Sequence, residues 1–140
     1  MTQITDQIHL GGWPTKWPDD IDAIIALYHH QQPRYAIPSH AKGFVSIQLS
    51  DEGDERPDNT WFDAQTGILR KYVEKDCRVL VHCAAGVSRS PTLVIAYLMR
   101  YNGLTMEQAM DYVGQRRDII YPNPTFRLAL KEYEEHLKAK

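Results

Sequence analysis

The sequence predicts an α/β protein with three layers (α/β/α), in which helices flank a central, mostly parallel sheet of about four or five strands. Apolar segments of strand length alternate along the chain with longer segments whose apolar residues recur at helical spacing. No internal repeat or low-complexity tract interrupts this alternation. With 140 residues the chain has the commonest size of one compact core, so we expect a single domain over residues 1–140.

The first third of the chain contains two strand candidates and a loop. Residues 8–10, directly before two glycines, predict a short opening strand. Residues 24–28 are apolar and fit either a buried strand or the end of a helix that begins near Asp19, since periodicity does not separate the two. Residues 29–43 contain two prolines and several polar side chains, which predict an irregular connection.

The middle of the chain predicts two strands around a helix. Residues 44–49 alternate between apolar and polar in the manner of a strand, and a polar loop with several acidic side chains follows at 50–59. Thr60 is a suitable cap for a helix whose apolar residues continue to Val73. The segment 78–82, with Val79-Leu80-Val81 at its centre, predicts a buried strand.

Three further helices complete the chain, the first of them mostly buried over residues 92–100. Proline is tolerated in a first helical turn, glycine commonly ends a helix, and a Thr–Gln pair three residues apart satisfies the first free amides. A loop at 118–123 separates the last two helices. Pro91 and Pro124 mark the beginnings of the first and last of these helices. Gly103 ends the first, and the pair Thr105 and Gln108 opens the second.

Composition and charge make several kinds of partner unexpected. The formal net charge is −2 and no basic cluster is present, so we expect no nucleic-acid partner. The longest strongly apolar run, Leu93 to Met99, is far too short to cross a bilayer. The first residues lack the basic and apolar parts of a signal peptide. We therefore expect a cytoplasmic monomer without a membrane partner.

The two cysteines, Cys77 and Cys83, are expected to remain unpaired. Extended chain between them spans about 20 Å, whereas a disulfide requires Cα atoms roughly 6 Å apart. Four ligands at zinc-like spacing are also missing from the sequence. We therefore expect neither a structural metal nor a cofactor.

One segment between the predicted strand at 78–82 and the helix at 92–100 has the features of an anion site. In a strand–loop–helix unit the loop amides can turn inward, and the helix N-terminus adds its positive end. Gly86 gives the loop backbone torsions closed to other residues, and Arg89 offers a bidentate fork to two phosphoryl oxygens. The same environment favours the thiolate form of Cys83. The segment reads His82-Cys83-Ala84-Ala85-Gly86-Val87-Ser88-Arg89-Ser90.

A simpler interpretation is that Cys83 is only a small core residue at the end of a buried strand. Chance places His-Cys with an arginine at this spacing in about half a per cent of chains of this composition. Requiring Gly86 and a hydroxyl at position 90 lowers that frequency by more than about a hundredfold. A charged nucleophile that faces a phosphoryl group is therefore the favoured interpretation.

The run from His82 to Ser90 resembles the signature loop of the cysteine-based protein tyrosine phosphatase superfamily. The residues around it resemble specifically the dual-specificity phosphatases, and the chain has the length of the small members that consist of a catalytic domain alone. The similarity is strong from about residue 44 to 138 and thin over 12–43. It rests on residues 78–99, 121–126 and 8–11.

This resemblance implies a mechanism and a set of roles. Cys83 is expected to attack phosphorus and form a cysteinyl-phosphate, which water then hydrolyses. Arg89 and the loop amides stabilise the equatorial oxygens, and Ser90 helps the thiolate leave. His82 orders the loop and helps to keep Cys83 ionised. The phosphate-binding loop consists of Ala84, Ala85, Gly86, Val87, Ser88 and Arg89.

The resemblance also implies a general acid, an aspartate on a loop about thirty residues before the cysteine. Asp51, directly after the strand at 44–49, is our assignment, and Asp54 is the alternative. Asn123 can position a water or a loop, although capping the last helix is the simpler role. Three tryptophans either border a substrate groove or pack in the core: Trp13, Trp17 and Trp61.

The expected substrates are phosphorylated proteins, with phosphotyrosine and phosphoserine or phosphothreonine both accepted in a shallow pocket. Uncharged loop residues at 84, 85 and 87 disfavour phosphoinositides, and an RNA 5′-phosphate or a glucan is a further alternative. A non-catalytic phosphoprotein-binding module is the main alternative from another class. A redox sensor would need a resolving cysteine, for which Cys77 is badly placed.

Overall fold

The computed structural model describes residues 1 to 140 and contains one five-stranded sheet. In spatial order its strands are β1-β2-β5-β3-β4, which agrees with the expected number. The bounds are β1 Thr2–Gln3, β2 Ile8–Gly11, β3 Ala23–Tyr28, β4 Gly43–Gln48 and β5 Val79–His82. The predicted strands at 8–10, 44–49 and 78–82 therefore lie within one residue of the observed ones.

The sheet is mostly parallel, as the sequence predicts. Only β1 runs antiparallel to its neighbour, whereas β2, β5, β3 and β4 pair in parallel. Parallel strands are buried on both faces, which explains why every residue from Ala23 to Leu27 in β3 is apolar and buried. Residues 24–28 are thus a strand, and the helix alternative is wrong. The polar pair Thr2–Gln3 gives no strand signal and joins the sheet only through β2.

Four helices follow, and most of their predicted ends are confirmed. Their bounds are α1 Asn59–Glu74, α2 Arg89–Asn102, α3 Met106–Arg116 and α4 Pro124–Lys138. Thr105 and Gln108 form the expected capping box, Asn123 caps α4, and Gly103 ends α2 in a left-handed conformation. α2 begins at Arg89, so that Pro91 is the third residue of its first turn.

The expected cap of α1 was wrong. Asp58, not Thr60, caps this helix, because its carboxylate accepts a hydrogen bond from the Trp61 amide at 2.8 Å. Thr60 lies inside the first turn. A carboxylate at the cap also interacts favourably with the positive end of the helix.

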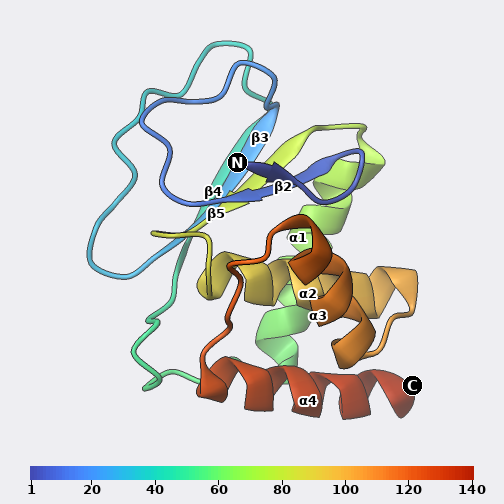
Figure 1. Ribbon diagram of the computed structural model, residues 1–140. Coiled ribbons are helices and arrows are strands. Elements are labelled where there is room, and N and C mark those ends of the chain that lie inside the picture. Colours follow the sequence, from blue (N-terminus) through green and yellow to red (C-terminus); the bar gives the residue numbers. More distant parts are fainter.

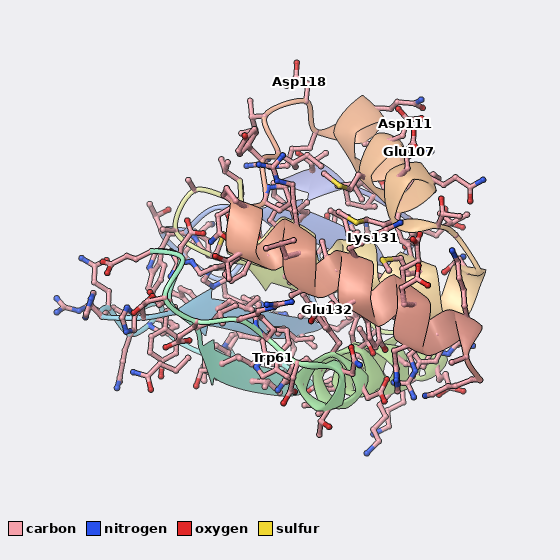
Figure 2. The ribbon with its side chains drawn as sticks, turned by 90° about the horizontal axis from the view of Figure 1, so that it is seen from below. Trp61, Glu107, Asp111, Asp118, Lys131 and Glu132 are labelled. Atoms are coloured by element: carbon pink, nitrogen blue, oxygen red, sulfur yellow. The ribbon has the colours of Figure 1, made fainter.

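All four helices lie on one face of the sheet (Figure 1). α2 lies at the centre of this layer, where it packs on β2, β3, β5 and the other three helices. Ala23, Ile25 and Leu27 of β3 face this layer and join the main apolar core. Figure 2 shows α4 across the outside of the layer, with Lys131 and Glu132 on it.

Irregular chain covers the other face of the sheet. Alternate residues of β3 and β5 point to this side and pack against the segments that follow β2 and β3, whose long loops extend from the sheet in Figure 1. The sheet is therefore covered on both faces, as the expected three-layer structure requires, but one of the two outer layers is irregular chain and not helix. The cluster on this face contains Trp17, Ile21, Ile24, Ala26 and Leu80, with Tyr35, Ala41 and Phe44 against it.

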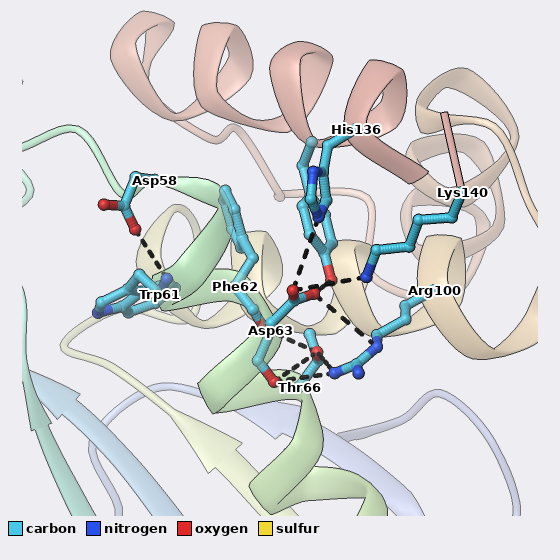
Figure 3. Close-up of polar contacts among 9 residues, drawn as sticks. Asp58, Trp61, Phe62, Asp63, Thr66, Arg100, His136 and Lys140 are labelled. Atoms are coloured by element: carbon cyan, nitrogen blue, oxygen red, sulfur yellow. Dashed lines mark hydrogen bonds and ion pairs between the residues drawn. The ribbon is translucent and has the colours of Figure 1, made fainter. Parts of the chain in front are cut away.

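Asp63 links α1 to α2 and α4 through a charged cluster (Figure 3). Its carboxylate accepts a hydrogen bond from the Tyr133 hydroxyl at 2.6 Å and lies 3.9 Å from Nε of Arg100. His136 and Lys140 each lie 3.6 Å from its second oxygen. Burial alone raises the pKa of Asp63, but the hydrogen bond from Tyr133 and the charges of Lys140 and Arg100 outweigh burial and lower it below the usual value.

None of the helices has both the length and the apolar composition needed to cross a membrane. Cys77 and Cys83 lie at the two ends of β5, and both thiols are buried and free.

Candidate active site

The residues singled out by the sequence meet at one edge of the sheet. The parallel strands β3, β4 and β5 present their carboxyl ends at this edge, where open α/β sheets commonly bind ligands. Cys83 directly follows β5, Arg89 opens α2, and residues 84–88 connect them. Asp51 lies in the loop that follows β4.

The carbonyl oxygens from Cys83 to Ser88 all accept hydrogen bonds from donors outside the 84–88 loop. Two of these bonds come from one guanidinium group, at 2.9 and 3.2 Å, and the shortest, 2.6 Å, comes from a backbone amide. Because every carbonyl is held from outside, the loop backbone is fixed in one orientation. The donors are the His82 ring, the Trp13 amide, the Arg117 side chain, the Tyr121 amide, and the amide and hydroxyl of Thr92.

The amide groups of the same loop, unlike its carbonyls, have no hydrogen-bond partner in the protein. The N–H groups from Ala84 to Arg89 donate to no atom of the protein. Peptide N–H and C=O groups point in opposite directions, so fixing the carbonyls outward turns these amides toward the centre of the loop. Together with the N-terminus of α2 they form a cradle for an oxyanion.

Gly86 and Arg117 depend on each other in this loop. Gly86 has φ of 68°, and a Cβ there would lie 2.6 Å from both the Arg117 guanidinium and the backbone of Gly11. Only glycine fits this left-handed and crowded position. The side chain of Arg117 also donates to the Thr2 hydroxyl at 2.9 Å, which connects β1 to the phosphate-binding loop.

Cys83 lies at the start of the loop, and the residue is only 2% exposed. Its sulfur lies 3.1 Å from the hydroxyl oxygen of Ser90, a residue that is completely buried. That hydroxyl also lies 3.4 Å from the Gly11 carbonyl oxygen. A hydroxyl at this distance can donate a hydrogen bond to a thiolate.

The guanidinium of Arg89 is fixed at one end only. Its Nη1 donates to the Leu49 carbonyl at 3.3 Å, while its buried Nε has no partner in the protein. Together with Ala84, Arg89 borders a pocket of about 310 Å³. The same pocket is lined by Trp13, Tyr28, His29, His30, Gln31, Asp51 and Glu52.

His82 is a neutral, buried histidine. Burial lowers the pKa of its imidazole to about 4. Nδ1 lies 3.3 Å from the Cys83 carbonyl oxygen, and the Trp13 ring meets the imidazole edge-on with centroids 5.3 Å apart. His82 therefore contacts the loop through a hydrogen bond rather than through charge.

The two candidate acids occupy different places. Asp51 lines the pocket beside Arg89, and the Asn123 side-chain amide donates to its carboxylate at 3.0 Å. Asn123 thus both caps α4 and contacts Asp51. Asp54 is exposed and does not line the pocket, and a hydrogen bond from Ser50 lowers the pKa of its carboxyl. Of the two, only Asp51 lines the pocket that Arg89 borders.

Several functional contacts escaped the sequence reasoning. Arg117, the Tyr121 amide and the Trp13 amide hold loop carbonyls. The resemblance covers Tyr121, and Trp13 was a candidate for a substrate groove, but nothing in the sequence assigns any of the three to the loop carbonyls. Trp13 also borders the pocket, whereas Trp17 is buried under the sheet and Trp61 lies in the first turn of α1. A larger pocket of about 500 Å³ lies between α2 and α4, but it contains neither a nucleophile nor the loop amides.

Two curated phosphatases have sequences similar to this chain. MAP kinase phosphatase with leucine-rich repeats protein 3 of Dictyostelium discoideum is 51% identical over 101 residues, which are 71% of this chain and 12% of that protein. Tyrosine-protein phosphatase vhp-1 of Caenorhabditis elegans is 34% identical in an alignment of 143 positions, which covers 98% of this chain and 22% of that protein. The chain thus spans less than a quarter of the length of either relative.

The crystal structure of human DUSP28 has the same fold, with a TM-score of 0.88 over 99% of both chains and 23% sequence identity. A family model described as "Dual specificity phosphatase, catalytic domain" matches residues 14–136. The chain therefore belongs to the dual-specificity phosphatase family.

Proposed function

We propose that the protein hydrolyses phosphate monoesters on proteins, both phosphotyrosine and phosphoserine or phosphothreonine, through a cysteinyl-phosphate on Cys83. The main support for this proposal is the cradle of unpaired amides from Ala84 to Arg89, in the loop that directly follows the buried Cys83. Such a set of fixed donors stabilises the equatorial oxygens of a phosphoryl group without reorganising during the reaction. Membership in the dual-specificity phosphatase family supports the same reaction.

The first step transfers the phosphoryl group to sulfur. The Cys83 thiolate attacks phosphorus, an S–P bond forms, and the bond from phosphorus to the substrate oxygen breaks. Protonated Asp51 donates its proton to that leaving oxygen, which departs as an alcohol or phenol. The loop amides and Arg89 bind the three equatorial oxygens throughout.

The second step releases phosphate. Asp51, now a carboxylate, accepts a proton from a water molecule whose oxygen attacks phosphorus, and the S–P bond breaks. The Ser90 hydroxyl, 3.1 Å from the sulfur, donates a hydrogen bond to the departing thiolate. Asn123, which donates to the Asp51 carboxylate, holds it at the pocket.

Proteins are favoured over other phosphate esters as substrates. The loop side chains at Ala84, Ala85 and Val87 carry no charge for the additional phosphates of a phosphoinositide. Glu52 and Asp51 at the pocket disfavour a polyanionic RNA end, and no feature of the chain suggests a glucan-binding surface. We also propose a cytoplasmic location, with which the free thiols are in keeping. The proposed form is a monomer that acts without a metal, a cofactor, nucleic acid or a membrane.

A binding module that has lost catalysis is the second candidate, since the amide cradle alone would bind a phosphorylated partner. The positions of Asp51, Ser90 and Cys83 favour catalysis, because binding requires none of the three side chains. Turnover of an aryl phosphate and of phosphotyrosine and phosphothreonine peptides separates the two. We expect Cys83→Ser to abolish turnover yet retain phosphopeptide binding, while Cys77→Ser, the control, retains both. Wild-type turnover by Cys83→Ser would remove Cys83 from the mechanism.

A further inference from the structure

Tyr35, in the irregular segment between β3 and β4, reaches the histidine beside the nucleophile. Its hydroxyl lies 2.7 Å from Nε2 of His82. We propose that Tyr35 is a positioning residue of the active site, which fixes the tautomer and orientation of His82 and through it the backbone of Cys83. This inference deepens the proposed function and rests on it.

The hydrogen-bond network assigns each proton. A carbonyl oxygen only accepts, so Nδ1 of His82, 3.3 Å from the Cys83 oxygen, carries the ring proton and donates it. The imidazole is neutral, because burial lowers its pKa to about 4, so Nε2 is bare and accepts. Burial raises the pKa of the Tyr35 phenol above its usual value, so the phenol keeps its proton and donates. The chain of donors runs from Tyr35 through His82 to Cys83.

Tyr35 is held for this contact by aromatic packing. Its ring meets the rings of Trp17, Phe44 and His82 edge-on, with centroids 6.2, 6.1 and 5.7 Å apart. Trp17 is in turn fixed by a 2.7 Å hydrogen bond from its indole N–H to the Ile21 carbonyl. The irregular layer over this face of the sheet thus has a second role besides covering apolar strands, since it holds the Tyr35 hydroxyl in place beside His82.

Loss of the Tyr35 hydrogen bond would affect the nucleophile through the peptide unit of Cys83. His82 binds the Cys83 carbonyl, and the same peptide unit carries the Ala84 amide, one of the unpaired donors of the cradle. With Tyr35 removed, the completely buried Nε2 loses its partner, and either tautomer of the imidazole becomes available. A mobile imidazole leaves the peptide less firmly oriented and the thiolate less stabilised.

Other groups that face Cys83 are distinct from this path. Ser90 and Arg89 approach from α2, and Asp51 lines the pocket from the loop after β4. None of them contacts the imidazole, whose Nε2 has Tyr35 as its only polar partner. The effect of Tyr35 is therefore separable from theirs.

The experiment measures the pH dependence of Cys83 alkylation by iodoacetamide, which reports the thiolate without requiring turnover. Tyr35→Phe keeps the ring and its packing and removes only the hydroxyl. We expect the midpoint of its alkylation profile to rise by about half to one pH unit, and alkylation below the midpoint to slow roughly three- to tenfold. Tyr112→Phe is the matched control, because it removes a hydroxyl that donates to the Ile4 carbonyl and not to His82 or the loop.

Two results would overturn the proposal. One is an alkylation profile of Tyr35→Phe that coincides with those of wild type and Tyr112→Phe. The other is a ¹⁵N imidazole spectrum of wild-type His82 that shows the proton on Nε2. Inactivity of the wild type toward every phosphate ester would refute the proposed function, yet the alkylation profile would still decide the role of Tyr35.

Discussion

Replacing Arg117 by glutamine tests whether the outward bonds of the loop carbonyls create the phosphate cradle. In the wild type its Nε donates to the Gly86 carbonyl at 2.9 Å and its Nη2 to the Ala85 carbonyl at 3.2 Å. Glutamine is too short to make both bonds. Without these bonds the two loop peptides can rotate. Their amides are then no longer held in the orientation that binds an oxyanion.

The magnitude follows from the exposure of the two bonds. A hydrogen bond from a charged donor contributes about 1.5–3 kcal/mol when buried. The bond to Gly86 is partly buried, so its contribution to the free energy lies at the lower end of this range. The bond to Ala85 is exposed and contributes little more. The total of about 1.5–2 kcal/mol corresponds to roughly 10- to 30-fold weaker phosphate binding.

The assay is competitive inhibition by inorganic phosphate during turnover of an aryl phosphate. Arg116→Gln is the matched control, because it removes the same charge from the neighbouring position. The Arg116 guanidinium lies over the Tyr112 ring, 3.6 Å from its centroid, and donates to the Tyr112 carbonyl, so it does not contact the loop. Equal inhibition constants for the two variants would refute the idea that outward carbonyl bonds organise the cradle.

Three further predictions concern the acid, the loop turn and the helix layer. Asp51→Asn should lower kcat/KM on phosphopeptides by about 10² or more, while Asp54→Asn should not; the reverse result would reassign the acid. Gly86→Ala should lower the free energy of unfolding, measured in urea, by at least about 2 kcal/mol, and an unchanged midpoint would contradict the steric reasoning. Asp63→Asn should lower it by about 1–2 kcal/mol at pH 7. That difference should shrink on acidification, since a group with a lowered folded pKa stabilises above its unfolded pKa and loses the effect as pH falls through the folded one. Asp118→Asn is the control, since the Asp118 side chain projects into solvent in Figure 2. It should change neither the free energy of unfolding at pH 7 nor its dependence on pH.

The nucleophile loop was predictable because its chemistry is contiguous. Residues 82–90 contain the cysteine, the glycine, the arginine and the hydroxyl within one strand–loop–helix unit. Parallel strands were predictable for a related reason: β3 is apolar from Ala23 to Leu27 and β5 from Val79 to Val81, as burial on both faces requires.

The supports of the loop were not predictable, because they come from distant positions. Arg117 directly follows α3 and has no local signature that distinguishes it from a surface residue. Tyr121 belongs to the segment 121–126 on which the resemblance rests, but nothing in that segment shows that its amide binds a loop carbonyl. Tyr35 lies in a polar, proline-containing segment that predicts only an irregular connection. Each acquires its role through a long-range hydrogen bond that exists only once the sheet has assembled.

The cap of α1 shows a smaller limit of the sequence. Asp58, Asn59 and Thr60 are three consecutive residues that all satisfy the rule for a helix cap. The choice depends on which side chain reaches a free amide of the first turn, and only the Asp58 carboxylate does so, at the Trp61 N–H. Element ends are uncertain by one or two residues for this reason.

The central claim is that Cys83 carries the phosphoryl group during turnover. Ser90→Ala removes the hydroxyl 3.1 Å from the sulfur and should slow the second step more than the first. Rapid acid quench of this variant during turnover of an aryl phosphate, followed by mass spectrometry of its peptides, should show one phosphate on the peptide that contains Cys83. Turnover with no phosphate on that peptide, or with phosphate on another residue, would contradict the account.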